Sequence, residues 1–367
     1  MRSNGLIGTL AAAVFSCVAS VSSIAADWQA GAGPEWKATL DAARKEGVVS
    51  VTGGAPDTLK PLGEAFERDT GIRLDALVGN FTELETRFTR EVRAEKSSLD
   101  VYFAGGSISI LLKENVLQPV KPLLMLPEVT NPKNWRDGGM KWFDNAEQYM
   151  PYPNQSVFGF PIFDSRSVKE GSIKSWQDLL KPEYKGKIIA YDPTVVGPGQ
   201  AVSAYLADQF GMDYVKKLLV EQDVKFTRVQ RQLVEGIARG DYAISLGASA
   251  TDIEAFRKEG VSTIVIGNMS DSGGSVLGGV SLPVVAKNNP HPNATKVFVN
   301  WYLSQNGQQV YVDVVKTPSR RTDVSSAAVP EYVVPKAGVK YLDQYREDWY
   351  WNTRPKLRDE VIKAVGR

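Results

Sequence analysis

Apolar and polar residues between positions 48 and 115 follow a strand period and a helix period in turn. A β-branched run begins at Val48, and Leu62, Ala65 and Phe66 then recur at helical spacing. Strands are expected at 48–52, 72–78 and 99–104, and helices at 59–70, at 83–96 and over an apolar stretch that ends near Asn115. Successive strand–helix units predict a parallel sheet covered by helices.

A second strand–helix series occupies residues 164–280. Its strands are expected at 187–191, 242–246 and 261–266, and its helices at 200–210, 214–221, 232–239 and from the 247–250 loop to Lys258. Two longer strands, at 156–163 and 278–285, lead from the first series to the second and back. Other helices are expected within 27–47, at 294–303, at 305–313 and from Asp359, and prolines restrict residues 120–155 to short elements.

The first 26 residues have the order of an export signal. Arg2 gives a positive start, residues 6–21 are uncharged and mostly apolar, and small residues near Ala25 suit cleavage. The run is short for a membrane span, so we expect a cleavable signal peptide and a periplasmic protein. The one cysteine, Cys17, lies in this leader. Lipid attachment there is the less favoured alternative, because Phe15 departs from the usual lipidation motif.

The chain is electrically almost neutral. Its 367 residues include 43 basic and 42 acidic side chains, and loss of the leader would remove only Arg2 from this balance. A neutral chain argues against general binding to nucleic acid or to an anionic membrane. The length is sufficient for two domains.

Motifs for catalysis or nucleotide binding are missing from the sequence. His291 is the only histidine, and it lies between two prolines where a surface turn before a helix is expected. No Gly-x-Ser-x-Gly surrounds a serine, and no acidic or histidine cluster has metal-hydrolase spacing. Residues 197–202 lack the third small residue of a dinucleotide fingerprint, and the phosphate-binding loop of an ATPase is absent. We therefore expect no enzyme activity, no cofactor and no bound metal.

Three stretches carry longer motifs. Residues 175–188 read SWQDLLKPEYKGKI; residues 290–308 begin HPNA after Pro290 and continue to Ser304, Gly307 and Gln308; residues 100–119 run from DVY to LQP. These stretches resemble the W-x-D-L-L-x-P-x-Y-K-G-K-I signature, the H-P-N-A segment and the third strand and helix of one protein family. That family is the iron(III)-type branch of the solute-binding proteins that serve ABC importers. The likeness covers residues 45 to 320, approximately.

The resemblance implies the type II periplasmic-binding-protein fold, with two α/β lobes that are joined by two crossing strands and hold solute between them. The two strand–helix series agree with this arrangement. We expect residues 27–158 and 285–367 in the first lobe, including the helices after 290, and residues 159–284 in the second. Such a receptor would be a monomer, bind a small-molecule solute and deliver it to a permease in the inner membrane.

Ligands of open parallel sheets lie beyond the carboxyl ends of the strands. This rule selects the loops that follow the predicted strands in both lobes. The candidate ligand-binding residues are Gly53, Gly54, Ala55, Asn80, Phe81, Gly105, Gly106, Ser107, Asp192, Thr194, Gly197, Gly199, Gln200, Gly247, Ala248, Ser249 and Asp252. Glycine admits close backbone approach, and a helix N-terminus favours an anion. A turn or capping role is the alternative for each position.

The resemblance also draws attention to an absence. Iron-binding members carry a Tyr-Tyr pair just after the strand that corresponds to residues 242–246, and this pair falls on Ser249 and Ala250. Neither side chain supplies the phenolate oxygen that ferric iron prefers. We expect a small anionic organic solute, such as a carboxylate, a phosphonate or a sugar phosphate. A metal receptor with non-standard ligands and an exported enzyme on the same fold are the alternatives, and the predicted loops offer no acidic, aromatic site for a polyamine.

Overall fold

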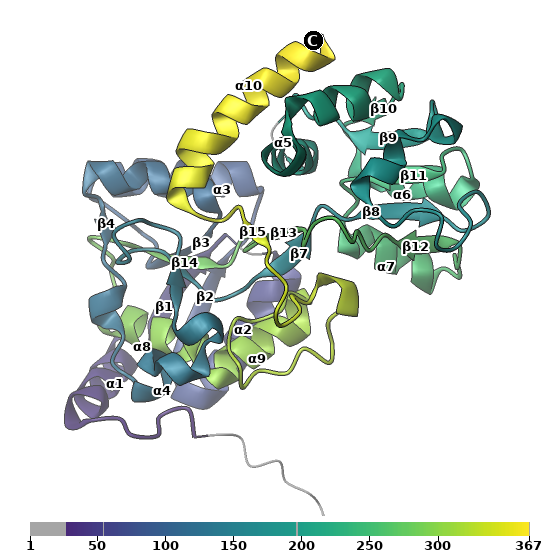
Figure 1. Cartoon of the computed structure of the whole chain (residues 1–367). Helices are drawn as coiled ribbons and strands as arrows, with labels where there is room; N and C mark the ends of the chain where they lie inside the picture. Colours follow the sequence, from purple (N-terminus) through teal and green to yellow (C-terminus); the bar gives the residue numbers. More distant parts are fainter. Residues whose placement is uncertain (1–26, 54, 196, 367) are drawn as a thin grey trace, which may run out of the picture.

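The computed structural model of the chain describes residues 27–53, 55–195 and 197–366. The proposed leader with Cys17, and the candidate residue Gly54, lie outside this part of the chain. No helix of the described residues is both long enough and apolar enough to cross a membrane. Two five-stranded sheets, each with its own helices, stand on either side of a smaller sheet (Figure 1).

The first large sheet has the strand order β2-β1-β3-β14-β4. Its strands are β1 (Val48–Thr52), β2 (Arg73–Leu77), β3 (Val101–Ala104), β4 (Leu117–Gln118) and β14 (Leu282–Ala286). β1 runs parallel to β2 and β3, whereas β14 is antiparallel to β3 and β4. Along β3, Val101 and Phe103 enter one apolar core while Tyr102 and Ala104 enter another. The sheet is therefore buried on both faces.

Helices cover the two faces of this first sheet. One face carries α1 (Pro34–Glu46), α2 (Pro56–Thr70), α8 (Pro292–Leu303) and α9 (Gln305–Val315); the other carries α3 (Phe81–Arg93) and the 3-10 helix η1 (Gly106–Glu114). α1 and α2 end at Gly47 and Gly71, which adopt left-handed φ values of 74° and 76°. Glycine accepts this conformation without steric cost, which explains both helix ends.

The second large sheet has the strand order β10-β9-β11-β8-β12. Its strands are β8 (Pro161–Asp164), β9 (Ile188–Tyr191), β10 (Lys225–Thr227), β11 (Ile244–Leu246) and β12 (Ile264–Ile266). β9, β10 and β11 are parallel, and β8 is antiparallel to β11 and β12. Its helices include α5 (Pro198–Lys216), the π-helical η7 (Lys217–Glu221), α6 (Gln230–Arg239) and α7 (Ala250–Lys258). The helical geometry of α5 is interrupted at Gly211. This interruption lies between the two separate helices that were expected at 200–210 and 214–221.

Short elements fill the remaining chain, as the prolines predict for residues 120–155. They are η2 (Lys121–Leu123), α4 (Pro127–Thr130), η3 (Pro132–Asn134), η4 (Arg136–Gly138), β5 (Lys141–Trp142), β6 (Pro151–Tyr152), η5 (Trp176–Leu180), η6 (Pro182–Tyr184) and η8 (Glu331–Val333). β5 and β6 pair as a two-stranded antiparallel ribbon.

The two connecting strands are broken, so the prediction of continuous strands at 156–163 and 278–285 is wrong. β7 (Ser156–Phe158) stops before Gly159, which has a φ of 85°, and Gly279, with a φ of 66°, lies between β13 (Ser275–Leu277) and β14. β7 and β13 form a separate sheet with β15 (Leu342–Asp343). β8 belongs to the second large sheet and β14 to the first. The breaks let each crossing segment change sheets, and glycine permits the required turn.

The last described helix packs on the second lobe. α10 (Arg354–Val365) follows the π-helical η9 (Trp349–Thr353), and its residues Leu357, Val361 and Val365 enter the apolar core that contains α5. Figure 1 shows α10, in yellow, beside α5. We expected residues 285–367 to lie entirely in the first lobe. The spacing of the three apolar side chains gives α10 one helical face that the second core covers instead.

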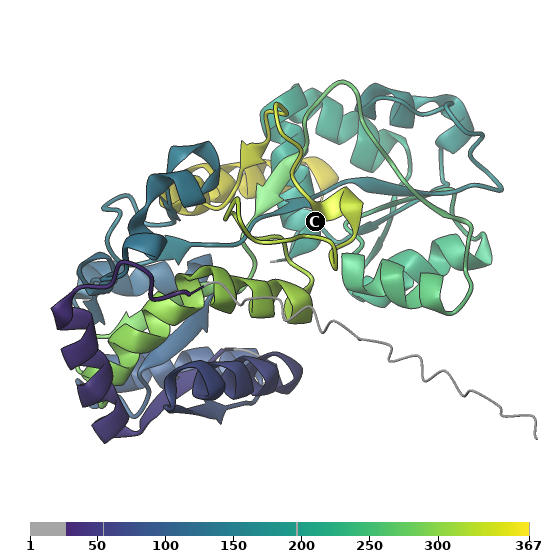
Figure 2. The same cartoon turned by 90° about the horizontal axis from the view of Figure 1, so that it is seen from below.

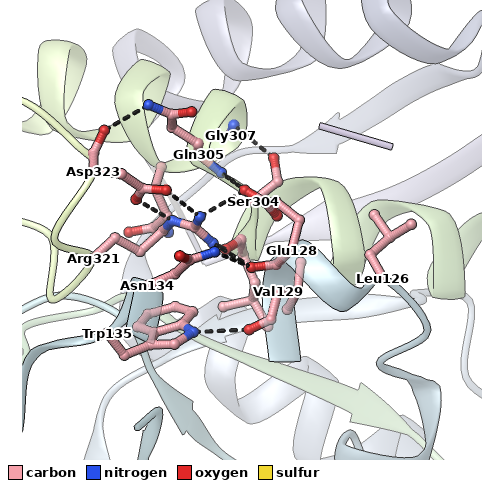
Figure 3. Close-up of polar contacts among 12 residues, drawn as sticks. Leu126, Glu128, Val129, Asn134, Trp135, Ser304, Gln305, Gly307, Arg321 and Asp323 are labelled. Atoms are coloured by element: carbon pink, nitrogen blue, oxygen red, sulfur yellow. Dashed lines mark hydrogen bonds and ion pairs between the residues drawn. The ribbon is translucent and has the colours of Figure 1, made fainter. Parts of the chain in front are cut away.

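A buried arginine connects three segments of the first lobe (Figure 3). Arg321 is 2% exposed, and its guanidinium contacts Glu128 at 2.6 Å and Asp323 at 2.7 Å. It also donates a hydrogen bond of 3.0 Å to the carbonyl of Leu303, the last residue of α8. Because Gln305 donates its backbone N–H to Glu128, the start of α9 belongs to the same network. The network holds the α8–α9 junction against the chain after α4.

We expect Arg321→Met to lower the free energy of unfolding by about 3–5 kcal/mol, because it leaves two carboxylates near each other without their cation. Urea unfolding followed by circular dichroism measures this change. Arg73→Met is the control, since the Arg73–Asp75 pair is exposed and should contribute less than about 1 kcal/mol. Equal effects of the two substitutions would contradict the stabilising role of the network.

Candidate functional site

The predicted loops of the first lobe follow β1, β2 and β3 at their carboxyl ends. Gly53 has a φ of 90°, and a side chain there would collide with the carbonyl of Phe103, so backbone packing explains this glycine. Ala55 precedes α2 and gives it no side-chain cap. Asn80 caps α3, because its Oδ1 accepts a hydrogen bond of 3.0 Å from the backbone N–H of Thr82.

Residues 105–107 lie beside side chains from elsewhere in the chain. Gly105 is the residue that precedes η1, and a side chain at Gly106 would press against the ring of Tyr350. The Ser107 hydroxyl donates a hydrogen bond of 3.0 Å to Glu85 Oε2 on α3. The loop at 105–107 therefore lies next to Glu85 and Tyr350, an acid and an aromatic side chain that were not among the candidates.

Asp192 is buried and its carboxylate is held by neighbours in the second lobe. Its Oδ1 accepts hydrogen bonds from the backbone N–H and the hydroxyl of Thr194 at 2.9 and 2.6 Å, and its Oδ2 lies 3.0 Å from Arg228 Nε. Burial alone would raise the pKa of Asp192, but these interactions outweigh it and hold the pKa below its usual value. Asp192 and Thr194 thus organise the loop after β9.

The glycines of the second lobe satisfy backbone requirements. Gly197 caps α5 with a φ of 144°, and Gly247 follows β11 with a φ of 90°. Gly199 leaves no space for a side chain, because one would collide with the carbonyl of Tyr191. Ala248 is buried. A turn or packing role, the alternative to ligand binding, therefore accounts for all four positions, which are Gly197, Gly199, Gly247 and Ala248.

Ser249 is the N-cap of α7, and its side chain is bonded within the cap. Its hydroxyl accepts a hydrogen bond from the backbone N–H of Asp252 at 3.1 Å and donates to Asp252 Oδ2 at 2.6 Å. Ala250 packs against a small apolar cluster that includes Val333. These residues form a helix start in which an acid also faces the positive end of the helix.

A C-terminal segment that the sequence did not suggest contacts both lobes. Trp351 Nε1 donates a hydrogen bond of 2.7 Å to Ser109 of η1 in the first lobe. Arg354 Nη2 donates one of 2.7 Å to Gln200 Oε1 in the first turn of α5, in the second lobe. The segment of η9 and α10 thus contacts η1, to which the candidate Ser107 belongs, and the candidate Gln200 directly.

Arg354 carries a partly buried positive charge without an acidic partner. None of the ion pairs among the described residues includes it, and its buried Nε makes no hydrogen bond there. Its guanidinium lies 5.2 Å from the centre of the Tyr350 ring. Burial lowers the pKa of Arg354, although the nearby Tyr350 opposes the shift. The group keeps free donor capacity for an anion.

We call Glu85, Ser107, Gln200, Tyr350 and Arg354 the interlobe cluster. Its members are linked by contacts: Ser107 is bonded to Glu85, the adjacent Gly106 lies against Tyr350, and Arg354 contacts both Tyr350 and Gln200. Among the hydrogen bonds and ion pairs of the described chain, none joins the loops at 53–55 and 80–81 to those at 192–199 and 247–252. Those loops lie at the predicted strand ends but are not linked directly.

A cavity of about 930 Å³ opens elsewhere, between the second lobe and residues 330–341. Phe158, Phe160 and Arg257 line it, together with Tyr332, whose hydroxyl donates a hydrogen bond of 2.8 Å to Glu254 of α7. No candidate residue from the sequence lines this cavity.

His291 has a structural partner that the surface-turn prediction missed. Its Nδ1 lies 2.8 Å from Oδ2 of Asp100, which is fully buried and also accepts the backbone N–H of Ser50. Burial raises the pKa of Asp100, although these contacts act in the opposite direction. The part of the chain that the structure describes contains no group of three or more His, Cys, Asp or Glu residues suited to hold a metal ion.

The fold has two α/β lobes, and sequence comparison identifies the class of protein to which it belongs. Residues 62–333 match the family described as bacterial extracellular solute-binding protein. The chain belongs to this family. A protein of Haemophilus influenzae, described as uncharacterized, is 27% identical over 161 residues, which cover 42% of this chain and 45% of that protein. The matched part thus spans less than half of that relative.

Solved structures of similar fold are two-lobe periplasmic binding proteins. The apo ferric ion-binding protein A of Pasteurella haemolytica aligns with a TM-score of 0.64 at 18% identity, covering 87% of this chain and 98% of that one. A putative extracellular solute-binding protein of Bordetella parapertussis gives 0.67 at 14%, covering 88% and 99%. The periplasmic binding protein AfuA of Actinobacillus pleuropneumoniae, with fructose-6-phosphate bound, gives 0.56 at 17%, covering 87% and 98%.

We expect Ser249→Ala to lower the free energy of unfolding by about 1 kcal/mol, because the N-cap hydrogen bond of α7 is lost. Solute affinity should not change, since the hydroxyl is already bonded within the cap. Urea unfolding and calorimetric titration measure the two effects. Ser165→Ala is the control, because Ser165 is exposed and the structure gives its hydroxyl no hydrogen bond. A large loss of affinity with unchanged stability would instead place Ser249 at the solute.

Proposed function

We propose that this chain is the extracytoplasmic receptor of an ABC importer, and that it captures a small anionic organic solute between its lobes. The anionic character of the solute is inferred from Arg354. This partly buried cation contacts Gln200 and Tyr350 but no carboxylate of the described chain. The protein acts by binding and does no chemistry on the solute.

An anion at Arg354 is favoured by electrostatics. A buried charge without a counter-charge is costly, and an anionic ligand would supply the partner that the protein does not. A guanidinium presents five N–H donors, of which the Gln200 contact uses one. Paired N–H groups suit the two oxygens of a carboxylate or a phosphate. The sugar phosphate bound to AfuA is an anion of this kind in a protein of similar fold.

Two lobes that share one ligand provide the mechanism of capture. Gln200 belongs to the second lobe, while Ser107 belongs to the first. A solute that touches both binds the closed arrangement better and shifts the population towards it. A change from mostly open to mostly closed requires roughly 5 kcal/mol of differential binding. The permease would then recognise the closed form.

The cellular setting follows from the same role. We place the mature protein in the periplasm as a monomer, exported by residues 1–26 as a cleavable signal peptide, with an inner-membrane permease as its partner. Nucleic acid is not a partner, in line with the neutral chain. A ferric receptor is less well supported, because Ser249 and Ala250 offer no phenolate oxygen and Ser249 is engaged in the α7 cap.

We expect Arg354→Gln to weaken the binding of anionic solutes about 10- to 100-fold, because it removes a charge-assisted interaction of about 1.5–3 kcal/mol. A thermal-shift screen of organic acids and phosphates finds the solute, and calorimetric titration measures its affinity. Arg358→Gln is the matched control. Arg358 lies on the same helix but already pairs with Asp359 at 2.7 Å. If both variants bind the solute as tightly as the unaltered protein, Arg354 is not its partner.

We also expect the radius of gyration, measured by small-angle X-ray scattering, to fall when the solute found in the screen saturates the protein. The reason is that closure brings two lobes together around the segments after β7 and β13. Binding without any compaction would contradict capture by lobe closure, whichever solute is bound.

A further inference from the structure

Glu85 is a partly buried acid for which the fold provides no cation. It lies on α3, accepts the hydroxyl of Ser107 at 3.0 Å, and takes part in none of the ion pairs of the described residues. The other partly buried charges of the helix and its end are paired, whereas Glu83 and Arg90 are exposed. Arg87 pairs with Glu91 at 2.7 Å, and Arg93 reaches Glu114 at 2.6 Å. Glu85 is thus an acid of α3 that faces the interlobe cluster without a counter-charge.

Aromatic side chains surround this acid. The hydroxyl of the buried Tyr102 lies beside Glu85; burial raises the pKa of Tyr102 strongly, and the negative charge of Glu85 adds to the shift. The ring of Phe81 is 6.1 Å from that of Tyr102, centre to centre, and is 38% exposed at the start of α3. A carboxylate next to aromatic faces is a favourable environment for an ammonium group. The loops alone had offered no such acidic, aromatic site.

Tyr350 lies near both Glu85 and Arg354: a side chain at Gly106, the neighbour of the Ser107 that is bonded to Glu85, would meet its ring, and Arg354 is 5.2 Å from the centre of that ring. Burial raises the pKa of Tyr350, Arg354 lowers it, and Glu85 raises it. Glu85 and Arg354 do not form an ion pair with each other among the described residues. The interlobe cluster therefore holds a negative and a positive group that are close to one aromatic side chain and separate from each other.

We propose that the solute is a short zwitterion, with an acidic group at Arg354 and a primary or secondary amine at Glu85. This inference rests on the proposed function and narrows its substrate class. A ligand with both groups satisfies two partly buried charges at once, whereas a simple anion leaves Glu85 unpaired next to the bound acid. The site therefore selects for the amine, because a partly buried acid left without a counter-charge penalises the analogue that lacks one.

The test compares ligands that differ only in the amine. Calorimetric titration would use β-alanine against propionate and 3-aminopropylphosphonate against propylphosphonate, with the same ω-amino acids N-acetylated as uncharged-amide analogues. The proteins are the unaltered full chain, Glu85→Gln, and Glu83→Gln as the matched control. Glu83 is exposed on the first turn of the same helix. Thermal melts of the free proteins establish that each variant is folded.

We expect at least one amine-bearing compound to bind about tenfold or more tightly than its partner without the amine. Glu85→Gln should remove most of that preference, leave the affinity for the plain acid unchanged or improved, and leave the melting temperature unchanged. Glu83→Gln should keep the preference. If Glu85→Gln does not fold, Glu85→Asp, which keeps the charge and shortens the reach, should retain a reduced preference.

The two proposals fail in distinguishable ways. Equal affinity with and without the amine, or a preference that survives Glu85→Gln, overturns the zwitterion while anion binding through Arg354 stands. Binding of plain acids with no binding of any amino compound has the same meaning. Binding of neither set overturns the anionic class of the proposed function, and anion binding that Arg354→Gln leaves intact shows that Arg354 is not the partner of the acid.

Discussion

The small sheet of β7, β13 and β15 is the part on which the rest of the arrangement depends. Each segment that passes between the large sheets enters this one first, and β13 pairs with both of its neighbours. Gln344, directly after β15, donates a hydrogen bond of 3.1 Å to the carbonyl of Ala201 in α5. A relative movement of the lobes must therefore act on these few hydrogen bonds and on the glycines that flank them. The lobes themselves are stiff, because each has a sheet buried on both faces.

Buried arginines in this molecule serve two different purposes, and their partners distinguish them. Arg321 meets two carboxylates and a helix carbonyl, so its charge is neutralised within the first lobe. Arg320 is also fully buried and contacts Asp137 at 2.9 Å. Arg320 and Arg321 also lie over aromatic rings, so Arg354 differs from both only in that no ion pair of the described residues includes it. Arg136 is also partly buried and outside the ion pairs of the described residues, and Arg354 is set apart from it by its place in the C-terminal segment that contacts both lobes.

Local rules were enough to predict much of the fold from the sequence. The β-branched run of β1 and the glycine stop of α1 lie where they were expected, because propensity and packing agree there. The breaks near Gly159 and Gly279 were not foreseen. The apolar pattern continues across them, and only the pairing partners in space determine where each strand changes sheet.

The sequence predicted where the candidate loops lie but not what their side chains bind. Topology placed the candidate loops at the ends of parallel strands, yet Asp192 and Ser249 turned out to bind their own loops. Glu85 and Arg354 were missed because one lies inside an amphipathic helix and the other in a charged C-terminal stretch. No spacing in the sequence relates them, since a third segment, η9, brings them near the same ring.

The position of α10 has a consequence for how the chain matures. The core of the second lobe is completed by Val361 and its neighbours, and the first sheet needs β14 between β3 and β4. Neither lobe can close its core while the ribosome is still producing the middle of the chain. Neither lobe is therefore specified by one contiguous stretch of chain, and shortening the C-terminus would open the core of the second lobe although that lobe is built mostly from the middle of the sequence.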